Sequence, residues 1–398
     1  MVVKNSVVCD IDGQREIDVR IEEGIITEMG KDLQDTDVFD AKGSYFMPLF
    51  VDTNVRVQDS SLNAKNIKTV SDEALKNGIG HIILNPDTSP AIDNEIVLEF
   101  AQNSFHDLGG AKVDLMLNTL KEDNTLSNIA ILLKRGAVAP YMSTIAKNDV
   151  AIRIAQYCQM YSVTLFCKAE DNSLISSGVM LEGDVSSKFG IAGIPDLSEV
   201  LHVSRMIEIA RHFKIKILFK SIASPRSIFL IDKAKKEGVD VRCEVSIHHL
   251  INSDESCKNF NTTAKLNPPL ASSEDVILLQ DALKNSQIDI LTTLHQPSSP
   301  LNKEVAFYDA AYGCEGLENA LGIYYTKLVK SGMISMSDLI RMCVKNPSDA
   351  IGQNRGKIKV GERANAMIFN PSIATVMNEA LSLYSQEELY GRVERVFC

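Results

Sequence analysis

The stretch YFMPLFVDTNV, residues 45–55, decides the fold of this 398-residue chain, because it begins a series of apolar runs of strand length. Seven more runs follow it: HIILNP (81–86), KVDLMLN (112–118), GAVAPYM (136–142), TLFCKA (164–169), KIKILFKS (214–221), VDVRCEVS (239–246) and DILTTL (289–294). Parallel strands that are covered on both faces give continuous apolar runs of this kind. Helical segments separate the runs. Eight strand–helix units favour an α/β fold of the (β/α)₈ TIM-barrel type over a doubly wound sheet, which usually has about six strands.

Two of the intervening helices have recognisable ends. In SPRSIFLIDKAKKEG, Ser224 stands at the N-cap, Pro225 at the first helical position and Gly238 just past the last turn. In PDLSEVLHVSRMIEIAR, Asp196 and Glu199 have the spacing of a capping box. Both signatures predict that a helix begins at these residues.

The two ends of the chain share a different pattern. Near the N-terminus, IDVRIEEGIITEMG alternates apolar and polar residues, and near the C-terminus GKIKVGERANAMIFNP and YGRVERVF do the same. Alternation with a period of two is typical of half-exposed β-strands. We therefore expect residues 1–46 and 354–398 to form one small β domain from both chain termini, beside a barrel over residues 47–353.

Composition excludes several classes of protein. With 41 Lys and Arg against 52 Asp and Glu, the net charge is −11, so we expect no nucleic-acid partner. The eight cysteines form no C-x-x-C pair, so neither a zinc knuckle nor a disulfide framework is predicted. No apolar stretch has the length of a signal peptide or a membrane span, so the chain is predicted to be cytoplasmic and free of membrane contact.

The polar residues that end the first strand are the first candidates for a functional site. In a TIM barrel the active site lies at the C-terminal ends of the strands. The first run continues as DTNVRVQ, in which Asn54, Arg56 and Gln58 point the same way because side chains alternate along a strand.

Seven separated blocks of the sequence carry a family resemblance: FMPLFVDTNV, NPDTSPAIDN, AEDNSLISSGVMLEGDVSSKFGIAGIPDLSEV, AKKEGVDVRCEVSIHHL, KLNPPL, GCEGLENAL and GKIKVGERANAMIFNP. In these blocks the chain resembles the dihydroorotase family of the cyclic amidohydrolase superfamily, over nearly its whole length. The resemblance implies an amidohydrolase barrel with a small β domain built from both ends. It also implies a role in pyrimidine biosynthesis, in which a pair of zinc ions activates a hydroxide that opens the dihydroorotate ring.

The resemblance further implies where the metal ligands should stand, and this chain has other residues there. The two strand-one histidines of the family correspond to Asn54 and Arg56, the strand-five histidine to Lys168, and the strand-six histidine to Ser221. The strand-eight aspartate, a metal ligand and general base in the family, corresponds to Leu294. Amide, guanidinium and aliphatic side chains are poor zinc ligands. We therefore expect no zinc and no other cofactor.

The substrate-binding positions implied by the resemblance are partly kept. Asn267 and His295 match the family, whereas Gln58 replaces an arginine that binds the substrate carboxylate and Asp87 replaces an asparagine. Because Arg56 and Lys168 bring positive charge into the site, we expect Asp52 and Asp87 to form an ion-pair network with them.

Most histidines are expected to be structural. His248 and His249 are neighbours at the predicted end of strand seven, where adjacent side chains point to opposite faces and cannot chelate one ion. We expect each to be hydrogen-bonded in the core. The same kind of role, or a surface position, is expected for His81, His106, His202 and His212.

Three functions remain open. The first is a pseudoenzyme, a dihydroorotase-like protein that acts as a structural or regulatory partner, either as a homo-oligomer such as a dimer or in complex with aspartate transcarbamoylase. The second is a binding protein for a small anionic metabolite held near Arg56 and Lys168. The third is a residual cyclic amide hydrolase, with His295 as base and Ser221 or Ser298 as nucleophile. A carboxylated Lys168 would bridge metals, but the histidines that it needs are absent.

Overall fold

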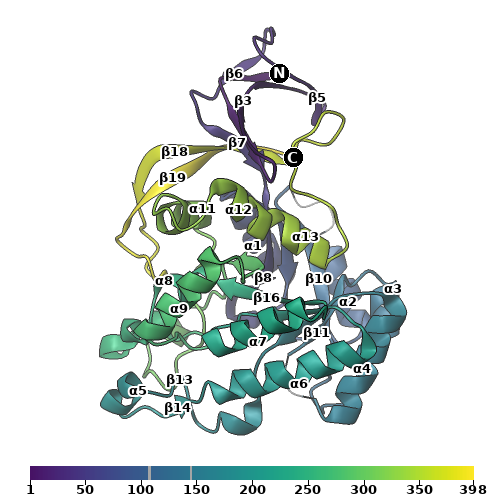
Figure 1. The fold of residues 1–398 in the computed structure, drawn as a ribbon, viewed down its shortest axis with the longest axis vertical. Helices are drawn as coiled ribbons and strands as arrows, with labels where there is room; N and C mark the ends of the chain where they lie inside the picture. The colour runs from purple at the N-terminus through teal and green to yellow at the C-terminus, as the bar shows by residue number, and fades with distance from the viewer. Residues whose placement is uncertain (106–108, 144–145) are drawn as a thin grey trace.

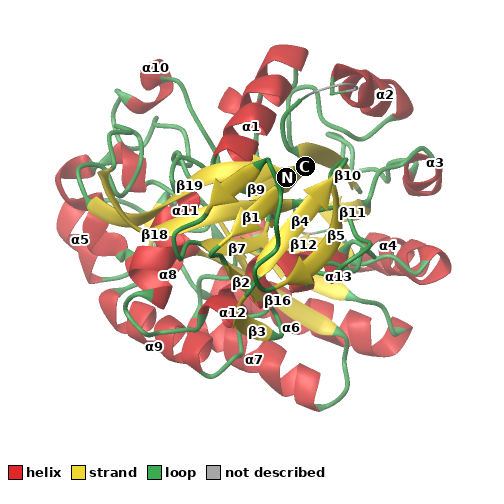
Figure 2. Cartoon of the chain, turned by 90° about the horizontal axis from the view of Figure 1, so that it is seen from above, coloured by secondary structure: helices red, strands yellow, loops and turns green. Residues whose placement is uncertain are grey.

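The computed structural model describes residues 1–105, 109–143 and 146–398, and its centre is a barrel of eight parallel strands (Figures 1 and 2). The strands are β8 (Phe50–Val55), β9 (Ile79–Leu84), β10 (Lys112–Asn118), β11 (Ala139–Met142), β12 (Leu165–Lys168), β15 (Ile217–Lys220), β16 (Val241–Ser246) and β17 (Ile290–Thr292). Each pairs in parallel with the next, and a parallel bridge between Val55 and His295 closes the ring. The eight predicted runs are these eight strands, so the predicted TIM barrel is confirmed.

Helices surround the strands, which lie toward the middle of the view in Figure 2. The longer ones are α1 (Ala64–Lys76), α2 (Glu95–Ser104), α3 (Ile129–Lys134), α4 (Asn148–Tyr161), α5 (Asp184–Phe189), α6 (Leu197–Phe213), α7 (Pro225–Lys236) and α9 (Ser273–Lys284). Shorter ones are α8 (Ile247–Ile251), α10 (Pro300–Lys303), α11 (Ala320–Tyr324), α12 (Met336–Ile340) and α13 (Asn346–Ala350), with π turns at Tyr325–Val329 and Arg341–Lys345. Short 3₁₀ segments occupy Gln58–Ser60, Asn172–Leu174, Asp254–Phe260 and Thr262–Ala264, and the third of these is kinked.

One of the two predicted helix starts is confirmed and the other is partly wrong. Helix α7 begins at Pro225 after Ser224 and ends before Gly238, as predicted, and it buries Ile228, Ile231 and Ala234. Helix α6 begins where expected, but the side chain of Asp196 makes no cap hydrogen bond. Glu199 instead turns toward the next strand–helix loop, so the capping box does not form.

Both chain ends meet in the β domain at the top of Figure 1. One sheet has the order β5 (Ile25–Gly30), β4 (Asp18–Glu22), β1 (Val2–Lys4), β6 (Val38–Asp40). The other has the order β19 (Glu388–Phe397), β18 (Ala366–Val376), β7 (Tyr45–Pro48), β2 (Val7–Asp10), β3 (Gly13–Glu16). Because β18 pairs antiparallel with β7, a C-terminal strand completes an N-terminal sheet. The predicted β domain from both termini is therefore confirmed.

The barrel interior has an apolar layer on which the polar site rests. The layer consists of buried residues from six strands and one helix: Ile83, Met116, Ala139, Tyr141, Phe166, Leu218, Ile290 and Ala350. A two-stranded sheet of β13 (Met180–Leu181) and β14 (Gly193–Ile194) lies in the long connection after β12. Among the described residues, no helix combines the length and the apolar composition that crossing a bilayer requires.

Candidate functional site

Asp52 fixes the first barrel strand to the last one. Its side chain is buried, and its two oxygens accept hydrogen bonds from the hydroxyls of Thr292 and Thr293, both at 2.5 Å. The backbone N–H of Thr293 adds a third bond at 3.0 Å. The expected ion pair of Asp52 is therefore wrong: hydroxyl and amide donors from β17 and its extension satisfy this carboxylate, and no cation among the described residues contacts it.

Asn54, at a predicted metal position, is a hydrogen-bond junction between three strands. Its amide nitrogen donates to the hydroxyl of Ser221 and to Oε1 of Glu244, each at 2.6 Å. The residue is 1% exposed, so these bonds are shielded from water. Its Oδ1, the amide atom that could bind an ion, accepts a hydrogen bond from Nη1 of Arg56 at 3.2 Å.

Lys220 and Glu244 form a fully buried ion pair that sequence reasoning missed. The ammonium lies 2.8 Å from Oε2 of Glu244, and the two side chains are 2% and 0% exposed. The ammonium also donates to the carbonyl of Thr53, whose hydroxyl donates to Glu244 at 2.5 Å. Burial lowers the pKa of Lys220, and the charge of Glu244 opposes that shift. The sequence contained a sign of this pair, because Lys220 and Glu244 each interrupt an apolar run that is expected to be a strand buried on both faces.

Arg56 pairs with Asp87, as predicted. Nη2 of Arg56 lies 2.9 Å from Oδ2 of Asp87, and Nη1 donates to Oδ1 of Asn54 at 3.2 Å. Burial favours the neutral acid, but the adjacent guanidinium outweighs it and holds the pKa of Asp87 below its ordinary value. Oδ1 of Asp87 is buried and has no hydrogen-bond partner among the residues that the structure describes.

The side chains at the other three predicted metal positions also have contacts that do not suit a metal ligand. Lys168, at the end of β12, pairs with Glu170 at 2.9 Å, so the expected pairing of Lys168 with an aspartate is wrong. Ser221 follows β15 with a φ of +51° and accepts the amide proton of Asn54. Leu294 is 1% exposed and belongs to an apolar cluster. It offers neither a ligand atom nor a base.

The predicted substrate-binding residues do not all face one cavity. Gln58 is exposed in a 3₁₀ turn, and its carbonyl accepts hydrogen bonds from Ser61 and Asn66. Asn267 is half-buried, and its Oδ1 has no partner.

The imidazole of His295 faces a group of carboxylates. Nδ1 accepts the N–H of Gly316 at 3.2 Å and lies 3.4 Å from Oε2 of Glu315. Burial lowers the pKa of His295 to about 3, so the ring is neutral. Ligand atoms of Glu73, His295 and Glu315 all lie within 4.8 Å of one another.

His248 and His249 lie in the short helix α8 instead of on a strand, so the argument from opposite strand faces was wrong. The expected hydrogen-bonded core role is confirmed. Nδ1 of His248 lies 3.3 Å from the hydroxyl of Tyr384, and His249 contacts Ser246 Oγ at 2.7 Å and the Pro268 carbonyl at 3.0 Å. Two other histidines are also buried and bonded: His81 to Asp114 and His202 to Cys167. His106 lies outside the described residues.

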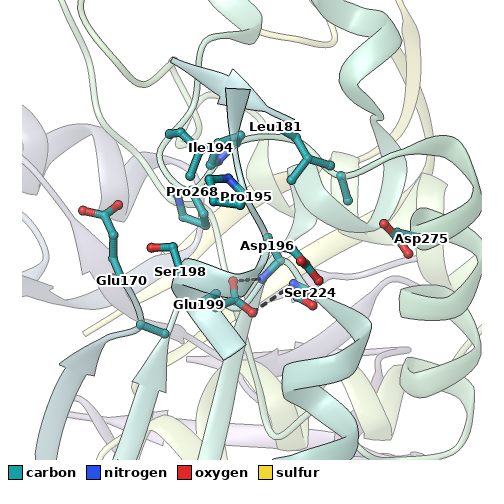
Figure 3. Close-up of a pocket in the computed structure, with 14 residues that line it drawn as sticks. Glu170, Leu181, Ile194, Pro195, Asp196, Ser198, Glu199, Ser224, Pro268 and Asp275 are labelled. Atoms are coloured by element: carbon teal, nitrogen blue, oxygen red, sulfur yellow. Dashed lines mark hydrogen bonds between the residues drawn. The ribbon is translucent and has the colours of Figure 1, made fainter. Parts of the chain in front are cut away.

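A small open pocket lies beside the ends of β12 and β15. Figure 3 shows four of its acidic side chains: Glu170, Asp196, Glu199 and Asp275. Of the residues that line it, none is a lysine or an arginine. Glu199 accepts backbone N–H bonds from Ala223 and Ser224, and burial raises its pKa to about 7. With Arg56 and Lys168 both paired, the charge argument for an anionic ligand has no support here.

Comparisons with known proteins agree with this architecture. No protein-family model matches the chain. Dihydroorotase from Acetivibrio thermocellus is 35% identical over 94% of this chain and 90% of its own length. Dihydroorotase from Elusimicrobium minutum is 34% identical over 98% of this chain and 90% of its own length.

Solved structures show the same fold at lower identity. L-hydantoinase (dihydropyrimidinase) from Arthrobacter aurescens has a TM-score of 0.84 and 22% identity, over 98% of this chain and 93% of that one. Dihydropyrimidinase from Brevibacillus agri NCHU1002 has a TM-score of 0.86 and 17% identity, over 99% and 93%.

Proposed function

The chain belongs to the dihydroorotase family, and we propose that it is a member without the zinc pair and without ring-opening catalysis, retained as a structural or regulatory partner in pyrimidine biosynthesis. The observation that carries the proposal is two ion pairs in the barrel centre, the partly exposed Arg56–Asp87 and the fully buried Lys220–Glu244. The carboxylates of Asp87 and Glu244 therefore already have a cation beside them.

The residues at the family's metal positions do not fit a pair of zinc ions. Zinc requires deprotonated imidazole, carboxylate or thiolate ligands. Asn54 and Lys168 point N–H donors at their neighbours, and Arg56 stays charged at every physiological pH. The guanidinium would repel a divalent ion in the same space. We therefore derive no catalytic step through a metal at this site.

The partner in this proposal is aspartate transcarbamoylase. Its support is the family resemblance, since inactive dihydroorotase homologues assemble with that enzyme and support its oligomer. A homodimer is the alternative assembly. In either case the barrel contributes its shape and its surfaces, and no bound zinc is needed to hold that shape.

A residual hydrolase would need His295 as a base, and no contact in the described residues favours it. The ring is neutral but buried, and its Nδ1 faces Glu315 and the N–H of Gly316 instead of a serine hydroxyl. The predicted nucleophile Ser221 is bonded to Asn54 instead of to an imidazole.

The first test is metal content and dihydroorotate turnover on one preparation. We expect no ring opening. We also expect that residues of the barrel centre contribute nothing to the zinc content of the protein. The Asn54→Ala and Lys168→Gln variants should have the metal content of the wild type. Turnover that falls with zinc content in those two variants would overturn the proposal.

The second test concerns the partner. The chain and the aspartate transcarbamoylase of the same organism would be mixed and analysed by sedimentation velocity. We expect one faster-sedimenting complex that persists in a chelator. Two species that sediment independently at micromolar concentrations would contradict the partner assignment and leave the metal result unaffected.

A further inference from the structure

A second group of metal-ligand side chains lies apart from the family's metal positions. Glu73 comes from α1, His295 from the chain that extends β17, and Glu315 from the loop before α11. We propose that these three side chains bind one divalent transition-metal cation, with Zn²⁺ as the best match.

One separation within the cluster already has the value expected around a bound ion. One ligand atom from each lies within 4.8 Å of the others. In a tetrahedral zinc site with bonds of about 2.0–2.1 Å, neighbouring ligand atoms are about 3.4 Å apart. The 3.4 Å between Nδ1 of His295 and Oε2 of Glu315 already has this value. A rotamer adjustment of Glu73 would complete the triad.

The imidazole of His295 is held in place and aimed into the cluster. The side chain is 1% exposed, and the backbone carbonyl of His295 accepts the N–H of Arg56 at 2.9 Å. Within the described part of the chain, the only hydrogen bond of the ring is the long one from Gly316 to Nδ1. A cation would take over that lone pair. A fixed, neutral imidazole is the form that binds zinc.

The two carboxylates lack compensating groups. Within residues 1–105, 109–143 and 146–398, the side chains of Glu73 and Glu315 receive no hydrogen bond, and only His295 lies within ion-pair distance of Glu315. The side chain of Glu315 is 20% exposed and Glu73 is half-buried, so both carboxylates are only partly shielded from water. Glu318 and Glu379 add negative charge nearby and raise the pKa of both acids further, after burial itself.

The positive charges around the cluster are peripheral. Lys76 lies 3.7 Å from Glu318, but its side chain is 72% exposed. Lys76, Glu318, Glu379 and Arg392 line a surface hollow, which is open to solvent. Neither cation is within ion-pair distance of Glu73 or Glu315, so a bound divalent ion would supply the missing charge.

The ligand types select the class of ion. One imidazole and two carboxylates form a mixed nitrogen and oxygen set, which suits Zn²⁺ and, less tightly, Mn²⁺. Calcium prefers six to eight oxygen ligands and gains little from an imidazole. Water would fill the remaining position of a tetrahedral zinc ion.

The test is titration of ZnCl₂, MnCl₂ and CaCl₂ into chelator-treated full-length protein, followed by calorimetry. We expect one Zn²⁺ per chain, weaker Mn²⁺ binding and no Ca²⁺ binding at micromolar concentrations. The Glu315→Gln and His295→Gln variants should each lose at least 100-fold in zinc affinity. Thermal unfolding of each variant shows whether it is folded.

Two control variants separate this site from general charge effects and from the barrel centre. Glu318→Gln removes a nearby charge without removing a ligand and should lose less than about threefold in affinity. Lys168→Gln lies at a family metal position and should bind zinc as the wild type does. Wild-type affinity in folded Glu315→Gln or no stoichiometric zinc binding would overturn the proposal, as would equal affinity for Ca²⁺. Zinc lost in Lys168→Gln but kept in Glu315→Gln would overturn the proposed function as well.

Discussion

The barrel centre and the Glu73–His295–Glu315 cluster contain similar side chains but differ in charge balance. In the centre, the carboxylates of Asp87 and Glu244 each lie within 3 Å of a buried cation. In the cluster, burial raises the pKa of Glu73 to about 7 and that of Glu315 to about 8, and the nearby carboxylates of Glu318 and Glu379 add to both shifts. A site with its own cations keeps its shape without metal. A site that lacks them depends on protons or added ions.

The largest effect should come from breaking the ion pair in the barrel centre. Lys220→Met leaves Glu244 charged, buried and without its cation, so we expect a loss of about 3–5 kcal/mol in the free energy of unfolding. Urea denaturation measures this loss. The matched control is Lys236→Met, which removes an exposed pair with Asp232 and should cost under about 0.5 kcal/mol. Equal losses in the two variants would contradict the comparison.

A smaller loss is expected at Arg56, because the side chain of Asp87 is 30% exposed and water reaches part of it. Arg56→Met should destabilise the protein by about 2–3 kcal/mol, measured by the same denaturation. Adding Asp87→Asn to that variant should recover at least half of the loss, since the uncompensated charge is then gone. No recovery would mean that Arg56 acts through packing.

Glu199 is intermediate between the cation-paired carboxylates of the barrel centre and the carboxylates of the cluster. Its carboxylate accepts hydrogen bonds from backbone N–H groups but is not paired with a cation among the described residues. Burial raises its pKa from 4.5 to about 7, so the folded state keeps a proton that the unfolded state has lost. Its contribution to stability is complete below pH 4.5 and is lost as the pH rises through about 7. The stability of the wild type should therefore fall by up to about 2 kcal/mol relative to Glu199→Gln, which does not titrate at this position, between pH 5 and 7. Parallel curves would show an ordinary pKa.

The smallest expected effect on the free energy of unfolding is a gain in stability, at Glu73. In a chelator at pH 8, Glu73→Gln removes one charge from the unbalanced cluster, so we expect stabilisation of about 0.5–1 kcal/mol. Glu394→Gln, on an exposed strand position, should change stability by less than that. Destabilisation by Glu73→Gln in metal-free protein would show that the carboxylate has a partner in the fold.

The sequence alone predicted the barrel because strand-length apolar runs are a local property of the chain. It also identified Arg56 and Asp87 as partners. The prediction for Asp52 failed because one of its donors, Thr292, lies 240 positions away in the sequence. The predicted capping box at Asp196 failed because Glu199 accepts a hydrogen bond from a neighbouring loop instead. Local spacing predicts a cap, but the packing of α6 against α7 decides whether it forms.

The sequence by itself determined the family, the eight-stranded barrel and the kinds of side chain at the family's metal positions. Each of these follows directly from residue types and their spacing along the chain. The tertiary structure alone decided which charged and polar side chains contact one another. Glu244 meets Asn54 across 190 residues, and Glu315 reaches His295 but no cation, because barrel closure brings strand ends together regardless of their order in the chain. Burial then sets the strength of each contact, since low-dielectric surroundings strengthen a paired charge and penalise an unpaired one.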